Sequence, residues 1–341
     1  MIKYIGSKRL LVSAIVDLVK KMPEVKSTLD LFSGTSRVGL ALKQEGYQVL
    51  ANDHNAYAAT IARCYIAADG AAVEKRARGI IDTLNAIPGR AGYFTETFCV
   101  KSRFFQPKNG ERIDAIRETL EKMNLKPIMK AVILVSLMEA ADRVDSTTGI
   151  QMAYLKNWAS RSNNDLQLKM PELVSLPSKH GPGLAFESDA MELLKSPLVK
   201  DVDLAYVDPP YNQHKYLGNY HIWESLVRWD KPEVYGVACK RVDCKTRGSD
   251  FNSKPKFESA FHSLIQAIPA KRLIVSYSSD GFLSYDTVIS ILGRKGSVNV
   301  HVFDNKRYVG AQIGIHNAQG RIVGAVGELR NSEYLFTVDA R

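Results

Sequence analysis

Apolar positions in the first 65 residues switch between helical and strand-like spacing. Residues 7–22 place an apolar side chain at every third or fourth position, which predicts an amphipathic helix. The short apolar runs TLDLF (28–32) and QVLAND (48–53) predict buried strands, with a helix between them that ends near Gly46. This order of helix, strand, glycine turn, helix, strand and helix is typical of the start of a parallel βαβ sheet.

The rest of the chain changes pattern twice. Helical spacing dominates the middle, above all in 111–123 and 127–143. Strand-like runs then return at 183–186, 203–207, 272–277 and 297–303, followed by an expected hairpin (311–315 and 321–326) and a last strand, EYLFTV. We therefore expect an α/β protein. Its Rossmann-like sheet domain comprises 1–67 and 181–341, and a mostly helical insertion occupies 68–180.

Composition narrows the class of protein. The chain has 341 residues, of which 45% are apolar, and this suffices for one large domain or two ordinary ones. No apolar run approaches about 18 residues, and the start MIKYIGSKRLL lacks the apolar core of a signal peptide, so we expect a soluble intracellular protein. The four cysteines form no CxxC pair and have no histidine at zinc-ligand spacing, which favours free thiols and no metal.

The charge of the chain points to a class of partner. A formal net charge of +10 favours polyanions, nucleic acid above all. Many basic proteins bind no DNA, however. The positive net charge therefore supports nucleic-acid binding only where basic residues cluster near a catalytic feature.

The stretch DLFSGTSRVG (30–39) predicts a strand, a tight glycine turn and a helix N-terminus, which together present free N–H groups to a ligand. It is neither G-x-G-x-x-G nor a P-loop. Asp53, at the end of the next strand, is placed to accept hydrogen bonds from ribose hydroxyls. An ordinary turn with a surface aspartate is the alternative. The turn has no basic residue besides Arg37, so an adenosine cofactor with a zwitterionic amino-acid tail fits better than a dinucleotide.

The stretch AYVDPPYNQ (205–213) ends an apolar strand on Asp208, two prolines and an aromatic ring. The prolines donate no hydrogen bond and stiffen the turn, which leaves the Asp208 carboxylate and the Pro209 carbonyl as acceptors beside the flat face of Tyr211. Two acceptors and a stacking ring suit the exocyclic amine of a base. A chance aspartate in a proline-rich turn is the alternative reading.

An aromatic amine is a weak nucleophile because its lone pair is delocalised into the ring. Acceptors on its hydrogens localise that pair, and a carboxylate stabilises the positive charge that develops on nitrogen. A sulfonium methyl held in line would complete the reaction without a metal or a covalent enzyme intermediate.

At this point the sequence resembles a known family, the Dam-like α class of S-adenosylmethionine-dependent DNA adenine-N6 methyltransferases. KYIGSK (3–8) resembles the segment that closes over the methionine part of the cofactor, DLFSGT resembles the cofactor turn, and DPPY resembles the catalytic motif. The resemblance assigns catalysis to Asp208, Pro209, Pro210 and Tyr211. It assigns S-adenosylmethionine binding to Tyr4, Gly6, Lys8, Asp30, Phe32, Ser33, Gly34, Thr35, Asp53 and Asp189.

The resemblance also implies a seven-stranded methyltransferase sheet with an antiparallel last strand, a target-recognition role for the insertion, and flipping of the target adenine out of the duplex. Asp208 in place of serine favours adenine N6 over cytosine N4. Ser36 departs from the commoner glycine, and RVDSTTGIQ (143–151) is only loosely similar to the segment near the target base, so the recognition sequence stays open.

Basic and aromatic residues after the DPPY stretch predict contacts with DNA phosphates. We expect these contacts from His214, Lys215, Tyr216, Lys240, Arg241, Lys245, Arg247, Lys306 and Arg307. The segment 239–256 is expected to be a loop, and FFQPKNG (104–110) a turn that approaches a groove. His221 and Trp223 are expected to begin a helix that packs on the core.

The leading hypothesis is an adenine-N6 methyltransferase acting on double-stranded DNA in the cytoplasm, associated with the nucleoid. We expect it to be a monomer without membrane contact, and a cognate restriction endonuclease is a conceivable partner. A methyltransferase acting on RNA or on a protein amide is one alternative, and a DNA-binding subunit with an inactive cofactor site is the other.

Overall fold

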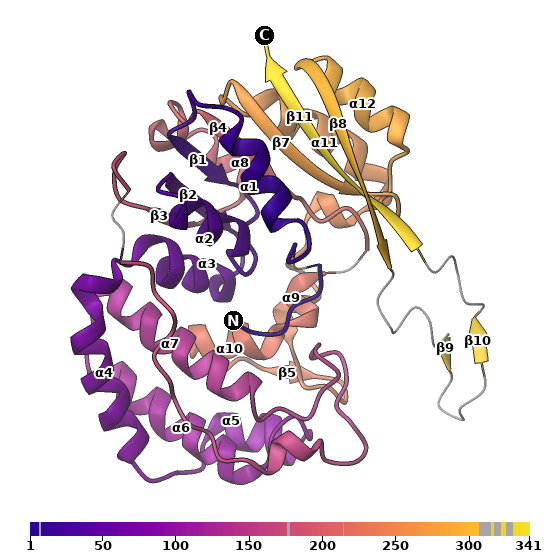
Figure 1. The fold of residues 1–341 in the computed structure, drawn as a ribbon. Coiled ribbons are helices and arrows are strands. Elements are labelled where there is room, and N and C mark those ends of the chain that lie inside the picture. The colour runs from indigo at the N-terminus through magenta and orange to yellow at the C-terminus, as the bar shows by residue number, and fades with distance from the viewer. Residues whose placement is uncertain (7, 176–177, 214, 307–314, 317–321, 325–329) are drawn as a thin grey trace. The chain divides into compact units, whose positions relative to one another are not determined.

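The computed structural model describes the chain except residues 7, 176–177, 214, 307–314, 317–321 and 325–329 (Figure 1). It divides into two compact units. The first comprises Met1–Asp203 and His214–Gly248, and the second comprises Leu204–Gln213 and Ser249–Arg341. These boundaries differ from 67 and 180, so the expected division into catalytic and target-recognition domains stays a prediction.

A seven-stranded sheet has the strand order β3-β2-β1-β4-β7-β11-β8. The strands are β1 (Ser27–Asp30), β2 (Gln48–Asp53), β3 (Leu184–Glu187), β4 (Leu204–Val207), β7 (Arg272–Ser278), β8 (Gly296–Lys306) and β11 (Arg330–Ala340). β2 is parallel to β1 and β3, and β4 is parallel to β7. The last strand, β11, lies between β7 and β8 and is antiparallel to both. The mixed α/β fold class and its antiparallel last strand are thereby confirmed.

In the first unit, the expected helices flank the early strands. They are α1 (Val12–Lys20), α2 (Arg37–Gln44) and α3 (Ala56–Ala62), and α3 continues into a π-helical turn, η1 (Arg63–Ala67). α1 begins later than expected because Leu11 and Val12 donate to the Lys8 carbonyl in a turn that precedes the helix. Its apolar face, with Ile15 and Val19, is fully buried, as the spacing predicted.

The middle of the chain is helical, as predicted. It contains α4 (Gly70–Ala86), α5 (Tyr93–Thr95), η2 (Glu96–Val100), α6 (Pro107–Lys122), α7 (Pro127–Asp142) and η3 (Ser160–Asn163). α7 packs between α4, α6 and α3 in the lower half of Figure 1, and nearly all of its apolar residues are buried. The predicted turn at FFQPKNG is wrong. Phe104 and Phe105 are buried and Pro107 begins α6, a position where a missing N–H costs nothing.

Short elements follow β3 and the DPPY stretch. They are α8 (Ala190–Leu193), η4 (Pro197–Val199), α9 (Tyr216–Asn219), α10 (His221–Arg228), β5 (Val234–Tyr235), β6 (Lys240–Arg241), η5 (Val242–Cys244) and η6 (Asp250–Asn252). The loop expected over 239–256 is therefore only partly correct, because β5 and β6 pair and α11 (Lys254–Ala267) begins within the range. His221 and Trp223 begin α10 and are buried, which confirms that prediction.

The second unit contains α11, α12 (Tyr285–Gly293) and the antiparallel pair β9 (Ile315–His316) and β10 (Ile322–Gly324). That pair agrees with the expected terminal hairpin where the two overlap, and the rest of the expected hairpin lies outside the described residues. The four cysteines are buried and free. Across the part of the chain that the structure describes, the helices are too short or too polar to cross a lipid bilayer.

His221 is a completely buried histidine at the start of α10. Its Nε2 lies 3.0 Å from the Gln151 carbonyl oxygen, and the Gln151 side-chain oxygen accepts a hydrogen bond from the Ile222 N–H at 2.8 Å. Burial lowers the pKa of His221 to about 3. The native protein therefore holds this ring neutral, whereas the unfolded chain protonates it near pH 6.5.

This difference predicts a pH-dependent stability. Between about pH 6.5 and pH 3 the unfolded state binds a proton that the native His221 does not, so stability falls as pH falls, by up to about 1.4 kcal/mol per pH unit. Urea unfolding of the wild type and of His221→Gln should diverge most near pH 7 and converge toward pH 4. A constant difference over that range would contradict the neutral, buried assignment.

Candidate active site

The glycine turn after β1 is shaped by two hydrogen bonds from its backbone. Ser33 donates its N–H to the Asn52 carbonyl at 2.8 Å, and Gly34 donates its N–H to the Asp53 carboxylate at 3.1 Å. Gly34 has φ +49°, a conformation that favours glycine. The turn predicted from the sequence is thereby tied to the end of β2.

The Asp30 side chain supports this turn through a hydrogen bond. It is buried, and its Oδ2 accepts the Gly39 N–H at 3.2 Å. A Cβ at position 39 would lie 3.1 Å from that oxygen, so the first turn of α2 sits directly on the carboxylate. Asp30 thus anchors the helix N-terminus that a ligand would meet, and its predicted direct contact with the cofactor stays a prediction.

Groups of the protein occupy most of the hydrogen-bond acceptor positions of the Asp53 carboxylate. Besides the Gly34 N–H, its carboxylate accepts the Asn55 N–H at 2.9 Å and the Asn55 side-chain amide at 3.2 Å. Burial raises the pKa of Asp53, and nearby His54 and the two backbone N–H donors oppose the rise. A carboxylate has about four acceptor positions, so about one remains for a ligand hydroxyl.

Two further polar atoms of these turns are enclosed by the protein. Among the described residues, the buried hydroxyl of Ser33 and the side-chain oxygen of Asn55 have no hydrogen-bond partner. Both atoms are enclosed by the protein, so a ligand would reach them only if the turn moved. The remaining acceptor position of Asp53 is therefore the feature of these turns that fits the ribose of S-adenosylmethionine.

The KYIGSK segment reaches the same turn through Tyr4. A Cβ on Gly34 would lie 3.4 Å from the Tyr4 ring, so two predicted cofactor residues are in contact. Tyr4 stacks on Tyr220 with ring centroids 4.5 Å apart, and its hydroxyl lies 3.2 Å from that of Tyr57. Burial raises the pKa of Tyr4 well above its usual value, so its hydroxyl stays neutral.

Tyr216, predicted to contact DNA, belongs to this aromatic stack. Its ring lies parallel to that of Tyr4 with centroids 5.3 Å apart. A Cβ on Gly6, which has φ +73°, would lie only 2.8 Å from the Tyr216 hydroxyl oxygen. Tyr216 therefore covers the KYIGSK loop, a function that its position after DPPY did not indicate.

The other predicted cofactor residues have varied environments. Asp189 is exposed, and its side chain accepts the Met191 N–H at 2.8 Å and thereby caps α8. Thr35 is buried, whereas Phe32 and Lys8 are partly exposed. Their contacts with a cofactor stay predictions.

The DPPY stretch lies in the second unit, after the fully buried β4. Pro209 is buried, and Asp208, Pro210 and Tyr211 are partly exposed. The Tyr211 carbonyl accepts the Phe282 N–H at 3.0 Å. The loop after β7 therefore holds the backbone of the turn.

Tyr277 supports the same turn and was not predicted. Its ring packs against Tyr211 with centroids 5.2 Å apart, and its hydroxyl accepts the Leu283 N–H at 2.8 Å. Burial raises its pKa to about 12. The tyrosine in the strand pattern of 272–277 was the available signal, but an aromatic residue in a strand more often belongs to the core.

The predicted DNA contacts fall into separate groups. Lys215 and Lys245 are exposed, Lys240 and Arg247 are partly exposed, and Arg241 is buried with 3% of its surface accessible. The Arg241 guanidinium is held by Asp230 at 2.7 Å and Asp243 at 3.0 Å. A phosphate contact requires an accessible guanidinium, so the structure gives Arg241 a structural role instead. His214 and Arg307 lie outside the described residues, and Lys306 ends β8.

Residues 4–278 match the family described as D12 class N6 adenine-specific DNA methyltransferase. The chain belongs to this family. It is 28% identical to type II methyltransferase M.FokI of Planomicrobium okeanokoites over 86% of this chain and 47% of that protein. It is 30% identical to the modification methylase StsI of Streptococcus sanguinis over 85% and 46%. The chain thus spans about half the length of these two relatives.

A relative of similar length is the type II methyltransferase M.NlaIII of Neisseria lactamica. It is 29% identical over 89% of this chain and 92% of that protein. The D12 match includes both the glycine turn and the DPPY stretch. The resemblance stated from the motifs is thereby confirmed at the level of the family.

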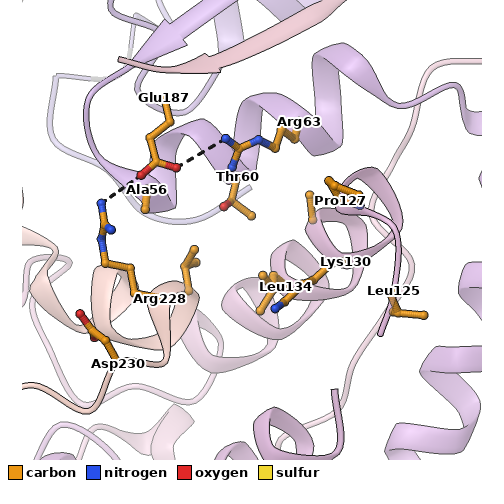
Figure 2. A pocket seen from close by; sticks show the side chains of 12 residues that line it. Ala56, Thr60, Arg63, Leu125, Pro127, Lys130, Leu134, Glu187, Arg228 and Asp230 are labelled. Carbon is orange, nitrogen blue, oxygen red and sulfur yellow. Dashed lines mark hydrogen bonds and ion pairs between the residues drawn. The ribbon is translucent and has the colours of Figure 1, made fainter. Parts of the chain in front are cut away.

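A pocket of about 430 Å³ lies in the first unit, between α3, α7 and α10. Figure 2 shows Glu187, at the end of β3, reaching toward Arg63 and Arg228 across it. The cations around this pocket are paired, since Arg228 also meets Glu224 at 2.7 Å and Lys130 meets Glu121 at 2.9 Å. The ion pair of Arg228 with Glu187 at this pocket ties α10 to the end of β3.

The contact of Gly6 with Tyr216 generates a prediction. Gly6→Ala should destabilise the protein by about 1–3 kcal/mol, because alanine is strained at positive φ and its Cβ meets the Tyr216 hydroxyl. Tyr216→Phe removes that oxygen, so the double variant should be more stable than the sum of the single effects predicts. Urea denaturation of the four proteins measures the coupling, and strictly additive effects would contradict the close approach.

Proposed function

We propose that this chain transfers a methyl group from S-adenosylmethionine to the N6 amino group of adenine in double-stranded DNA. The observation that carries the proposal is the family match over residues 4–278, which includes the glycine turn, Asp53 and DPPY in unbroken form. The amine-orienting chemistry of an Asp-Pro-Pro-Tyr turn is independent support, because it rests on residue types alone.

The DPPY turn would act on the base. The Asp208 carboxylate and the Pro209 carbonyl accept hydrogen bonds from the amino group, which localises its lone pair and stabilises the positive charge that forms on nitrogen. Tyr211 stacks on the ring, an interaction worth roughly 1–3 kcal/mol that offsets part of the cost of removing the base from the duplex. The backbone bond from Phe282 to Tyr211 keeps this turn stiff.

The glycine turn and Asp53 would hold the cofactor. S-adenosylmethionine supplies an electrophilic methyl carbon when it is bound. Asp53 has about one acceptor position left for the ribose. Tyr4 and Gly6, covered by Tyr216, would close over the amino-acid tail.

Phosphate contacts are proposed for the exposed lysines 215 and 245 and for the partly exposed Lys240, which suits a chain of net charge +10. We propose a monomer that works with the DNA in the cytoplasm of a bacterial or phage-infected cell. The relatives are named type II methyltransferases and modification methylases. A cognate restriction endonuclease is accordingly the proposed functional partner.

Asp208→Asn tests the catalytic assignment. The change keeps the size of the side chain but loses the negative charge, so the rate of methyl transfer should fall by at least 100-fold, or about 2.7 kcal/mol. Affinity for S-adenosylmethionine should stay within about threefold of the wild type. Transfer of labelled methyl from S-adenosylmethionine to DNA, followed by nucleoside analysis for N6-methyladenine, measures the rate.

The same assay separates the rival functions. Methyl transfer to RNA or to a glutamine amide, with DNA unmodified, would reject DNA adenine as the substrate. Wild-type protein that binds DNA but neither binds S-adenosylmethionine nor transfers methyl would indicate an inactive subunit. An Asp208→Asn variant with full activity would remove Asp208 from the mechanism.

A further inference from the structure

We infer that Arg247, expected from the sequence to contact DNA phosphate, is instead a positioning residue that holds the cofactor-binding loop after β2. This inference rests on the proposed use of Asp53 for the cofactor. The contacts that carry it lie within the first unit, where Arg247, Glu224 and residues 53–57 meet.

Glu224 of α10 is the centre of this network. Its carboxylate has no accessible surface, and Oε2 accepts the Tyr57 N–H at 3.1 Å. That N–H belongs to the first turn of α3, whose positive dipole end favours a carboxylate. Oε1 accepts from Arg228 at 2.7 Å and from Arg247 at 2.8 Å. The charge of the buried carboxylate is therefore fully compensated by one helix end and two guanidinium groups.

Arg247 connects this carboxylate to the loop itself. Its second terminal nitrogen donates to the His54 carbonyl at 3.3 Å, while the first also approaches Asp243 at 3.4 Å. His54 is the residue directly after Asp53, and Tyr57 is three residues further on. Glu224 therefore holds the loop at Tyr57 by accepting its N–H, and Arg247 holds it at His54 by donating to its carbonyl.

The same network of hydrogen bonds extends to the glycine turn. Between His54 and Tyr57, Asn55 donates both its N–H and its side-chain amide to Asp53. Asp53 in turn accepts the N–H of Gly34. A loop that loses its hold at His54 would shift the Asp53 carboxylate relative to the turn that presents the N–H groups.

The charge around Arg247 argues against a phosphate contact. Its guanidinium lies between two carboxylates, Glu224 and Asp243, so its positive charge is offset locally. Lys245, two residues earlier, differs in this respect. It is exposed, and its ammonium lies 4.3 Å from the centroid of the Tyr235 ring. Lys245 accordingly suits a phosphate better than Arg247 does.

Arg228 provides a matched control. It donates to the same oxygen of Glu224 as Arg247 does, but its other contact is Glu187 at 3.0 Å instead of the His54 carbonyl. Arg228→Gln thus removes one of the two cations beside Glu224 and keeps the hydrogen bond from Arg247 to the His54 carbonyl. The comparison isolates the contact with the loop.

The experiment compares Arg247→Gln, Arg228→Gln and Lys245→Gln in the full chain. Calorimetric titration with S-adenosylmethionine, without DNA, measures cofactor affinity. DNA binding over a range of salt measures the number of phosphate contacts, and hydrogen exchange of a peptide covering 53–60 measures protection of the loop.

We expect Arg247→Gln to weaken cofactor binding on the order of 10-fold, the loss of a charge-assisted hydrogen bond, and to speed exchange in 53–60. Its salt dependence of DNA binding should equal that of the wild type. Arg228→Gln should stay within about threefold in cofactor affinity. Lys245→Gln should lower the salt slope by about one and leave the cofactor affinity unchanged.

Two outcomes would overturn this inference without affecting the proposed function. One is unchanged cofactor affinity in Arg247→Gln with a reduced salt slope, which would make Arg247 a phosphate contact. The other is an equal loss of affinity in Arg247→Gln and Arg228→Gln, which would place the effect in the charge of Glu224 instead of the loop. If Arg247→Gln does not fold, Arg247→Lys keeps the charge beside Glu224 and is judged by the same comparisons.

Failure of the proposed function would look different. Wild-type protein that binds no S-adenosylmethionine would reject both the function and the cofactor role of Arg247. If the wild-type protein binds S-adenosylmethionine and either outcome of the preceding paragraph is observed, only the inference on Arg247 is rejected.

Discussion

The hydrogen bond from the Gly34 N–H to the Asp53 carboxylate is the constraint on which the glycine turn depends. It joins the turn after β1 to the end of β2, and it requires a residue that tolerates φ +49°. Asp30 supports the turn through the Gly39 N–H, and the Tyr4 ring lies against Gly34. These contacts hold the turn and the Asp53 carboxylate in place.

A buried carboxylate in α10 organises the surroundings of that site. Burying a charge costs several kcal/mol unless good partners surround it. Glu224 has a helix N-terminus and two arginines, and these partners reach toward β2 and β3 through His54 and Glu187. The segment after the DPPY stretch therefore contributes to the architecture around Asp53, even though its basic composition suggests only nucleic acid.

Patterns of apolar spacing predicted the strands and most helices, because a buried face must repeat with the period of its element. β2 has the bounds expected from QVLAND, and α7 is buried as its apolar run required. The errors fell where local signals have two meanings. Pro107 reads as a turn residue but starts α6, and the basic stretch from 239 contains β6 and the first residues of α11.

The sequence by itself determined the family and the identity of the chemical groups, because a carboxylate before two prolines and a glycine turn with an acid 23 residues after Asp30 are short-range patterns. Only the tertiary structure decided which charges are accessible. Arg241, Arg247 and Lys245 are similar in sequence context. In the structure, however, Arg241 is buried between aspartates, Arg247 donates to the His54 carbonyl, and Lys245 is exposed. Partners distant along the chain fix these roles, and no local pattern records a contact between residues nearly 200 positions apart, such as Arg247 and His54.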